Sequence, residues 1–147
     1  MKPQDLRIGN WVFCPEIGDT YTDRSPYIKE FCFQINQINT WGVRLDIGHG
    51  AVHKCNFDQT IEPIPISEDW LVKFGFQKEE MEEGEGHYYS LRLNNSIYCD
   101  LTLLGVFENG VWEVVLFPYG KFFRFKYINQ VQNIVFELTG KELDNKY

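Results

Sequence analysis

Three potential metal ligands lie close together in one glycine-containing segment. His49, His53 and Cys55 have the spacing H-x3-H-x-C, and imidazole and thiolate groups are the usual ligands of structural zinc. A tetrahedral site needs a fourth ligand, which only a distant residue such as Cys14 or Cys32 could supply, and such sites usually carry paired ligands on both sides. We therefore interpret the three residues as ordinary loop and strand residues and expect no metal or cofactor.

The segment KFFRFK combines cationic and aromatic side chains, the combination by which proteins bind single-stranded nucleic acids. In a strand, alternate side chains point to opposite faces, so Phe123 and Phe125 would share one face and Phe122, Arg124 and Lys126 the other. We favour an inward aromatic row and an outward basic row over a nucleic-acid site. The basic residues are kept as candidate interaction residues: Lys121, Arg124 and Lys126.

The sequence gives less support for a catalytic site than for the two sites above. Cys99 beside Asp100, with His87 on a neighbouring strand, has the residue types of a nucleophile, an orienting carboxylate and a base. Cys99 lies in an alternating strand, however, where a buried thiol is the more common outcome. Phosphate-binding glycine motifs are absent, and the glutamates between residues 79 and 85 are interpreted as a solvated hairpin tip rather than a cation site. We expect no catalytic residues.

The composition describes a globular chain with an acidic excess. The 147 residues are 44% hydrophobic and 16% aromatic, which is enough to fill a core. The net charge of −7 argues against non-specific duplex binding, because such binding needs a basic face that neutralises phosphates. No apolar run is long enough to cross a membrane, and the N-terminus lacks a secretory h-region. We therefore expect a cytoplasmic protein whose four cysteines are buried free thiols, although two disulfides would also fit.

Residues 1–63 are expected to form a small barrel. Their apolar residues alternate in short runs that are separated by turn signals, such as the Asn39-Thr40 step. Five short strands in about 60 residues suggest an SH3-like β-barrel. The strands are expected at residues 6–14, 31–38 and 41–47, within 47–55, and at 60–64.

Residues 64–147 are expected to form an α+β unit after a stiff Pro-Ile-Pro joint. A short helix should begin after Ser67, a good N-cap, and end at Gly75. An antiparallel meander should follow and lead into a C-terminal helix that ends at Gly140 and packs on the sheet. The strands are expected at residues 87–93, 97–107, 111–117 and 121–126. The fold class is thus predicted to be α+β, in two subdomains or one compact domain.

The C-terminal helix has an apolar stripe and a polar side. Tyr127, Ile128, Val131, Ile134, Val135 and Leu138 recur at helical spacing. Phe136 lies off that stripe, among polar residues that include Gln132 and Asn133. An apolar side chain on a polar surface needs a cover, from a neighbouring segment or from a partner. We therefore predict that Phe136, Gln132 and Asn133 are candidate interaction residues.

Three segments carry a family resemblance: LRIGNWV at residues 6–12, PIPISEDWLVKFGF at 63–76 and KYINQVQNIVFELTGKEL at 126–143. Together they resemble a group of small uncharacterised proteins that are common in genomes of Bacteroides-type gut bacteria, their prophages and other mobile elements. The segments occur in the same order as in that group, so the resemblance is expected to span the chain. Relatives often have a histidine where this chain has Asn129, and a catalytic histidine is therefore not expected there.

These observations favour a non-enzymatic accessory or protein-interaction protein of a phage or mobile element. Its partner would be another protein or a second copy of the chain. The alternative is a nucleic-acid-associated module that uses the Lys121–Lys126 strand. A zinc protein or an enzyme is the least favoured interpretation.

Overall fold

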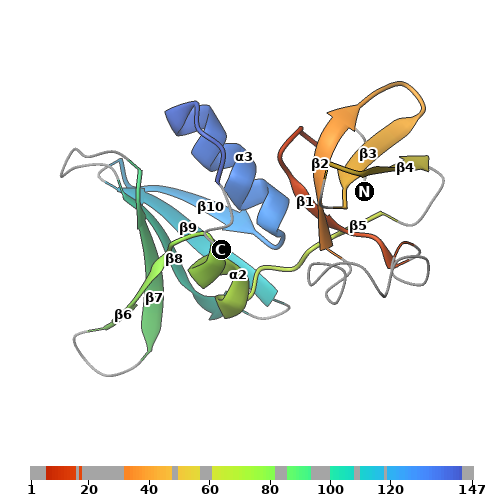
Figure 1. Ribbon diagram of the computed structural model, residues 1–147. Coiled ribbons are helices and arrows are strands. Elements are labelled where there is room, and N and C mark those ends of the chain that lie inside the picture. Colours follow the sequence, from red (N-terminus) through yellow and green to blue (C-terminus); the bar gives the residue numbers. More distant parts are fainter. Residues whose placement is uncertain are drawn as a thin grey trace. The chain divides into compact units, whose positions relative to one another are not determined.

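Two antiparallel sheets make up most of this protein, a computed structural model of which is shown in Figure 1. The structure describes residues 6–15, 17, 32–47, 50–56, 61–81, 86–93, 100–107, 110–117 and 119–143, with backbone alone at 104–107, 117 and 121. The chain divides into two compact units, residues 1–64 and 65–147, and each unit holds one sheet. Two helices among the described residues, α2 and α3, belong to the second unit. The fold class is therefore α+β, as predicted.

The first unit contains a sheet with the strand order β4-β3-β2-β1-β5. A tight turn joins β2 to β3. The Asn39 Oδ1 stabilises this turn by accepting hydrogen bonds from the backbone N–H groups of Trp41 (2.9 Å) and Gly42 (3.0 Å). Pro63 lies in β5, an edge strand, where its missing N–H group costs least. The strands are β1 (Trp11–Phe13), β2 (Cys32–Ile38), β3 (Gly42–Asp46), β4 (Val52–Asn56) and β5 (Glu62–Pro63).

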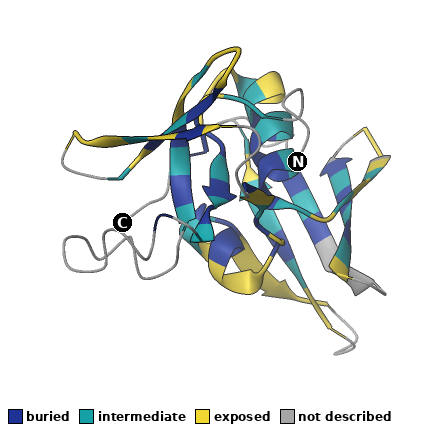
Figure 2. Ribbon diagram, turned by 90° about the vertical axis from the view of Figure 1, so that its right-hand side faces the viewer, coloured by how far each residue is buried: buried dark blue, intermediate teal, exposed yellow. Residues whose placement is uncertain are grey.

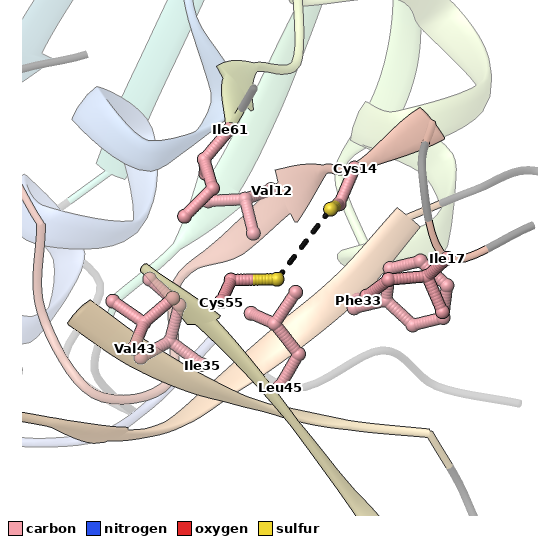
Figure 3. Close-up of a cluster of buried hydrophobic side chains, with 9 residues drawn as sticks. All are labelled: Val12, Cys14, Ile17, Phe33, Ile35, Val43, Leu45, Cys55 and Ile61. Atoms are coloured by element: carbon pink, nitrogen blue, oxygen red, sulfur yellow. Dashed lines mark hydrogen bonds between the residues drawn. The ribbon is translucent and has the colours of Figure 1, made fainter. Parts of the chain in front are cut away.

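The sheet of the first unit is strongly curved. Cys14 follows β1 and Cys55 lies on β4, yet their Sγ atoms are 3.6 Å apart. Two strands separate β1 from β4 in the sheet, so a flat sheet would hold them about 14 Å apart. A register shift in β2 between Ile35 and Gln37 supplies a bend. The curved sheet encloses the buried side chains of Figure 3: Val12, Cys14, Ile17, Phe33, Ile35, Val43, Leu45, Cys55 and Ile61.

The second unit contains a meander with the strand order β10-β9-β8-β7-β6. The predicted strands are present among the described residues, and β6 is an additional strand, whose Glu79 and Glu80 were expected in a hairpin tip. Every residue of β6 is exposed, so this edge strand shows no apolar alternation in the sequence. The strands are β6 (Gln77–Glu80), β7 (His87–Arg92), β8 (Asp100–Phe107), β9 (Val111–Phe117) and β10 (Lys121–Phe125).

Both predicted helices form with their predicted ends. The helix α2 (Glu68–Lys73) begins after Ser67, whose Oγ accepts a hydrogen bond of 3.4 Å from the Trp70 N–H group. The helix α3 (Ile128–Thr139) ends at Gly140, which adopts the left-handed conformation at φ 68°. Their buried side chains are Trp70 and Leu71 of α2 and Ile128, Asn129, Val131, Gln132 and Val135 of α3.

The prediction of a polar surface on α3 is wrong for one of its candidate residues. Gln132 is 0% exposed, and therefore presents nothing to a partner. It lies four residues after Ile128 and three before Val135, and these spacings place it on the buried side of the helix. Asn133 and Phe136 are half-buried.

Candidate binding surface

The second sheet has one buried face and one open face. Directly paired residues of neighbouring strands share a face, so the strand register assigns each side chain to one side. The buried face carries Tyr89, Leu101, Leu103, Trp112, Val114 and Leu116. We refer to the opposite side as the outer face; it carries Glu79, Tyr88, Ser90, Arg92, Asp100, Thr102, Glu113, Val115, Phe122 and Arg124. Figure 2 shows how burial alternates along these strands.

A hollow of about 500 Å³ lies on the outer face, over β6, β7 and β8. Most of its side chains come from alternate positions of three adjacent strands, because these positions point to the same side of the sheet. The polar groups include Glu79 on β6, then Tyr88, Ser90 and Arg92 on β7, and Asp100 and Thr102 on β8.

Glu79 accepts two hydrogen bonds within the hollow. Its Oε2 accepts a hydrogen bond of 2.8 Å from the Tyr88 hydroxyl, and its Oε1 accepts a hydrogen bond from the Ser90 hydroxyl. The hydrogen bonds from Ser90 and Tyr88 and the charge of Arg92 lower the pKa of Glu79 below 4.5. These interactions favour the ionised carboxylate, so Glu79 is a fixed negative charge at neutral pH.

Asp100 is the least satisfied group of the hollow. Its Oδ1 is buried and accepts no hydrogen bond from the described residues. The Arg92 Nε lies 3.6 Å from this oxygen, which is an ion-pair distance but too long for a hydrogen bond. A buried acceptor without a donor is costly, so a ligand group with an N–H or O–H donor would gain by reaching it.

The predicted alternation of the KFFRFK segment is confirmed. Phe123 and Phe125 are half-buried and stacked, with ring centroids 6.0 Å apart, whereas Phe122 is 67% exposed. Arg124 is exposed and lies 3.5 Å from a Glu113 carboxylate oxygen, and the exposed Lys126 ammonium lies 5.8 Å from the ring centroid of Tyr127. The side chain of Lys121 lies outside the described residues.

The candidate zinc ligands are only partly brought together. His53 and Cys55 point to the same side of β4, two positions apart, and Cys55 faces Cys14. His49 lies outside the described residues. Across the described ranges, no three His, Cys, Asp or Glu side chains are grouped so that they could hold a metal ion.

The catalytic arrangement considered from the sequence does not assemble. Asp100 pairs with Arg92, at the opposite end of β7 from His87. Five residues of extended strand place His87 and Asp100 about 17 Å apart. Cys99 lies outside the described residues, as do Glu82–Glu85 of the acidic segment.

Most residues of the hollow were not among the candidates predicted from the sequence. Polar residues at alternate positions of β7, namely Tyr88, Ser90 and Arg92, were a signal that this face of the strand is not buried. Asp100 and Thr102 repeat the pattern on β8. The missing information was the register, which alone shows that the two polar rows lie side by side.

Comparisons with known proteins identify no relative of this chain. No family model, curated protein or solved structure matches it. Within the described parts of the chain, neither helix has the length and apolar character needed to cross a membrane.

Proposed function

We propose that this chain is a non-enzymatic interaction protein, and that it binds a protein partner through the outer face of the second sheet. The observation that carries the proposal is the pairing of an exposed aromatic side chain, Phe122, with a hollow that contains the unsatisfied Asp100 oxygen, on one face. The resemblance of its three sequence segments supports a role in a phage or mobile element.

The chemistry of the outer face favours a protein as the partner. Aromatic and arginine side chains are enriched at protein interfaces and contribute most of their binding energy. The outer face offers Phe122 and Tyr88 together with Arg92 and Arg124. Carboxylates accompany both arginines, so the face has mixed charge and could pair with the mixed surface of another protein.

We further propose that the first unit is an SH3-like barrel, a small fold often used for binding. Its strand order supports this assignment, since β1 pairs with both β2 and β5. The bend in β2 and the approach of Cys14 to Cys55 support it as well, because both are needed to roll five strands around one core.

A nucleic-acid-associated module is the second candidate. The exposed row of Phe122, Arg124 and Lys126 favours it, because cations beside an aromatic ring bind single strands. Glu113 beside Arg124 and the net charge of −7 weaken it. Fluorescence anisotropy with labelled single-stranded DNA at low salt tests it: a salt-dependent increase supports this candidate, and no change removes it.

Affinity capture from a Bacteroides-type lysate, read by quantitative mass spectrometry, tests the proposed surface. Phe122→Ser should lose a partner that the wild-type chain retains, and the purified partner should then bind at least about 10-fold more weakly. Trp41→Ser is the matched comparison, because Trp41 is also exposed (79%) but belongs to the first unit. Loss of the partner with Trp41→Ser alone, or with neither variant, would overturn the assignment to the outer face.

A further inference from the structure

Two thiols face each other in the core of the first unit. Cys14 and Cys55 are 41 positions apart in the sequence, and their Sγ atoms are 3.6 Å apart (Figure 3). Both are reduced and buried, with exposures of 0% and 2%. The curvature of the sheet, rather than any sequence motif, brings them together.

We propose that Cys14 and Cys55 form a reversible disulfide, which makes the core of the first unit a site of oxidative modification by low-molecular-weight disulfides. A disulfide bond of about 2.05 Å requires the two sulfur atoms to approach by about 1.5 Å. Rotation of the two short side chains together with a small movement of β4 supplies this distance. The proposal is independent of any partner at the outer face.

The reaction proceeds by two thiol–disulfide exchanges. One cysteine thiolate attacks a sulfur of the small disulfide RSSR, forming a mixed disulfide and releasing one RS⁻. The second cysteine thiolate then attacks the protein sulfur of that mixed disulfide, which forms the Cys14–Cys55 bond and releases a second RS⁻. The protein loses two protons and two electrons, and RSSR is reduced to two RSH.

The sheet topology makes Cys55 the first thiol to react. Cys55 lies on β4, an edge strand that pairs only with β3 among the described strands. Cys14 follows β1, which is paired on both sides. Edge segments open locally more often than central ones, so the small disulfide reaches Cys55 first and Cys14 resolves the mixed disulfide.

A metal site is the competing use of two close thiols. Structural zinc takes four ligands, whereas the described residues provide no group of three. Disulfide formation needs only the two sulfur atoms. The pair therefore fits oxidation better than metal binding.

The test equilibrates the natively folded full chain with oxidised glutathione and then blocks free thiols. Before blocking, the expected product is lighter than the reduced chain by about 2 Da, and after blocking it yields a proteolytic peptide that links Cys14 to Cys55. Its Tm should exceed that of the reduced chain by at least about 5 °C, because the cross-link closes a long loop. A dithiol reductant should reverse both changes.

Single variants separate this disulfide from other thiol reactions. Cys14→Ala should accumulate glutathione on Cys55, whereas Cys55→Ala should leave Cys14 unmodified. Cys32→Ala is the matched control and should form the same linked peptide as the wild-type chain. The wild-type peptide map decides the question even if a core variant fails to fold: absence of the Cys14–Cys55 peptide from the native chain, when the urea-unfolded chain does oxidise, would overturn the proposal.

Discussion

The two units close their cores in different ways. In the first unit the sheet itself bends, and its own strands surround the apolar side chains. In the second unit the buried side chains come from two helices and from one face of the sheet. A sheet that bends around a core keeps its inner face for packing, whereas a sheet with helices on one side leaves the other side free. The hollow and the exposed Phe122 both lie on that free side of the second sheet.

The two units also differ in how solvent reaches their reactive groups. The thiols of Cys14 and Cys55 lie inside the first unit, so reagents reach them only when the sheet opens. The polar groups of the second unit, such as Glu79 and Arg92, line a hollow that is open to solvent. The rate at which the thiols of the first unit react should therefore depend on the stability of that unit. Binding of a partner at the hollow of the second unit should not depend on local opening.

The largest expected effect tests whether a helix closes the core of the second unit. Leu71 of α2 is 0% exposed, and the adjacent Val72 is 51% exposed. Leu71→Ala should lower the free energy of unfolding by about 2–5 kcal/mol, whereas Val72→Ala should change it by less than about 0.5 kcal/mol. Urea titration followed by circular dichroism measures both. Similar values for the two variants would mean that α2 does not cover the sheet.

The next effect tests the close packing of the curved sheet. A Cβ atom on Gly42 would collide with the Cys55 carbonyl oxygen and lie 2.8 Å from the Asn56 Cα, so Gly42→Ala must push β4 away from β3. We expect the free energy of unfolding to fall by about 3 kcal/mol.

Gly50→Ala is the control for that change. Gly50 has a positive φ of 76°, but no atom lies within 4 Å of the place that a Cβ atom would take there. Gly50→Ala should lower the free energy of unfolding only through backbone strain, by about 1 kcal/mol. Equal losses for the two glycine variants, again by urea titration, would argue against tight packing between β3 and β4.

Local signals allowed much of this fold to be predicted. Ser67 before two acidic residues predicts a helix start, and Gly140 after an apolar stripe predicts a helix end; both are observed. The alternation of Phe122, Phe123 and Arg124 likewise predicted their faces. These features depend on residues within a few positions of one another, so the sequence alone contains them.

Features that depend on distant residues could not be predicted in this way. The strand β6 is defined by its pairing with β7 and not by its own exposed residues. The burial of Gln132 depends on the width of the surface that α3 covers. The hollow and the facing of Cys14 and Cys55 depend on strand register and sheet curvature, which no local pattern records.

A smaller effect measures how much the helix cap supports the second unit. Ser67→Ala removes the hydrogen bond from the Trp70 N–H group at the start of α2. The expected loss is about 1 kcal/mol of unfolding free energy. Ser67→Asp should restore most of it, since aspartate also accepts this bond. A Ser67→Ala variant as stable as the wild-type chain in thermal unfolding would show that the cap contributes nothing.

The smallest expected effect is that of replacing Glu79 on the outer face, where solvent screens charges. The hydrogen bonds from Ser90 and Tyr88 lower the pKa of Glu79 in the folded chain below its ordinary value of 4.5. The ionised Glu79 therefore stabilises the fold above pH 4.5, and this stabilisation is lost as the pH falls through the lowered pKa of the folded chain. The wild-type chain should thus exceed Glu79→Gln in stability at pH 6, by less than about 1 kcal/mol, and this excess should shrink as the pH falls through the lowered folded pKa. Urea titrations across this range measure it. Ser90→Ala, which removes the largest cause of the shift, should reduce the pH-dependent excess. An excess that grows as the pH falls would contradict the hydrogen-bonded carboxylate, and the hollow would then lose its fixed negative charge.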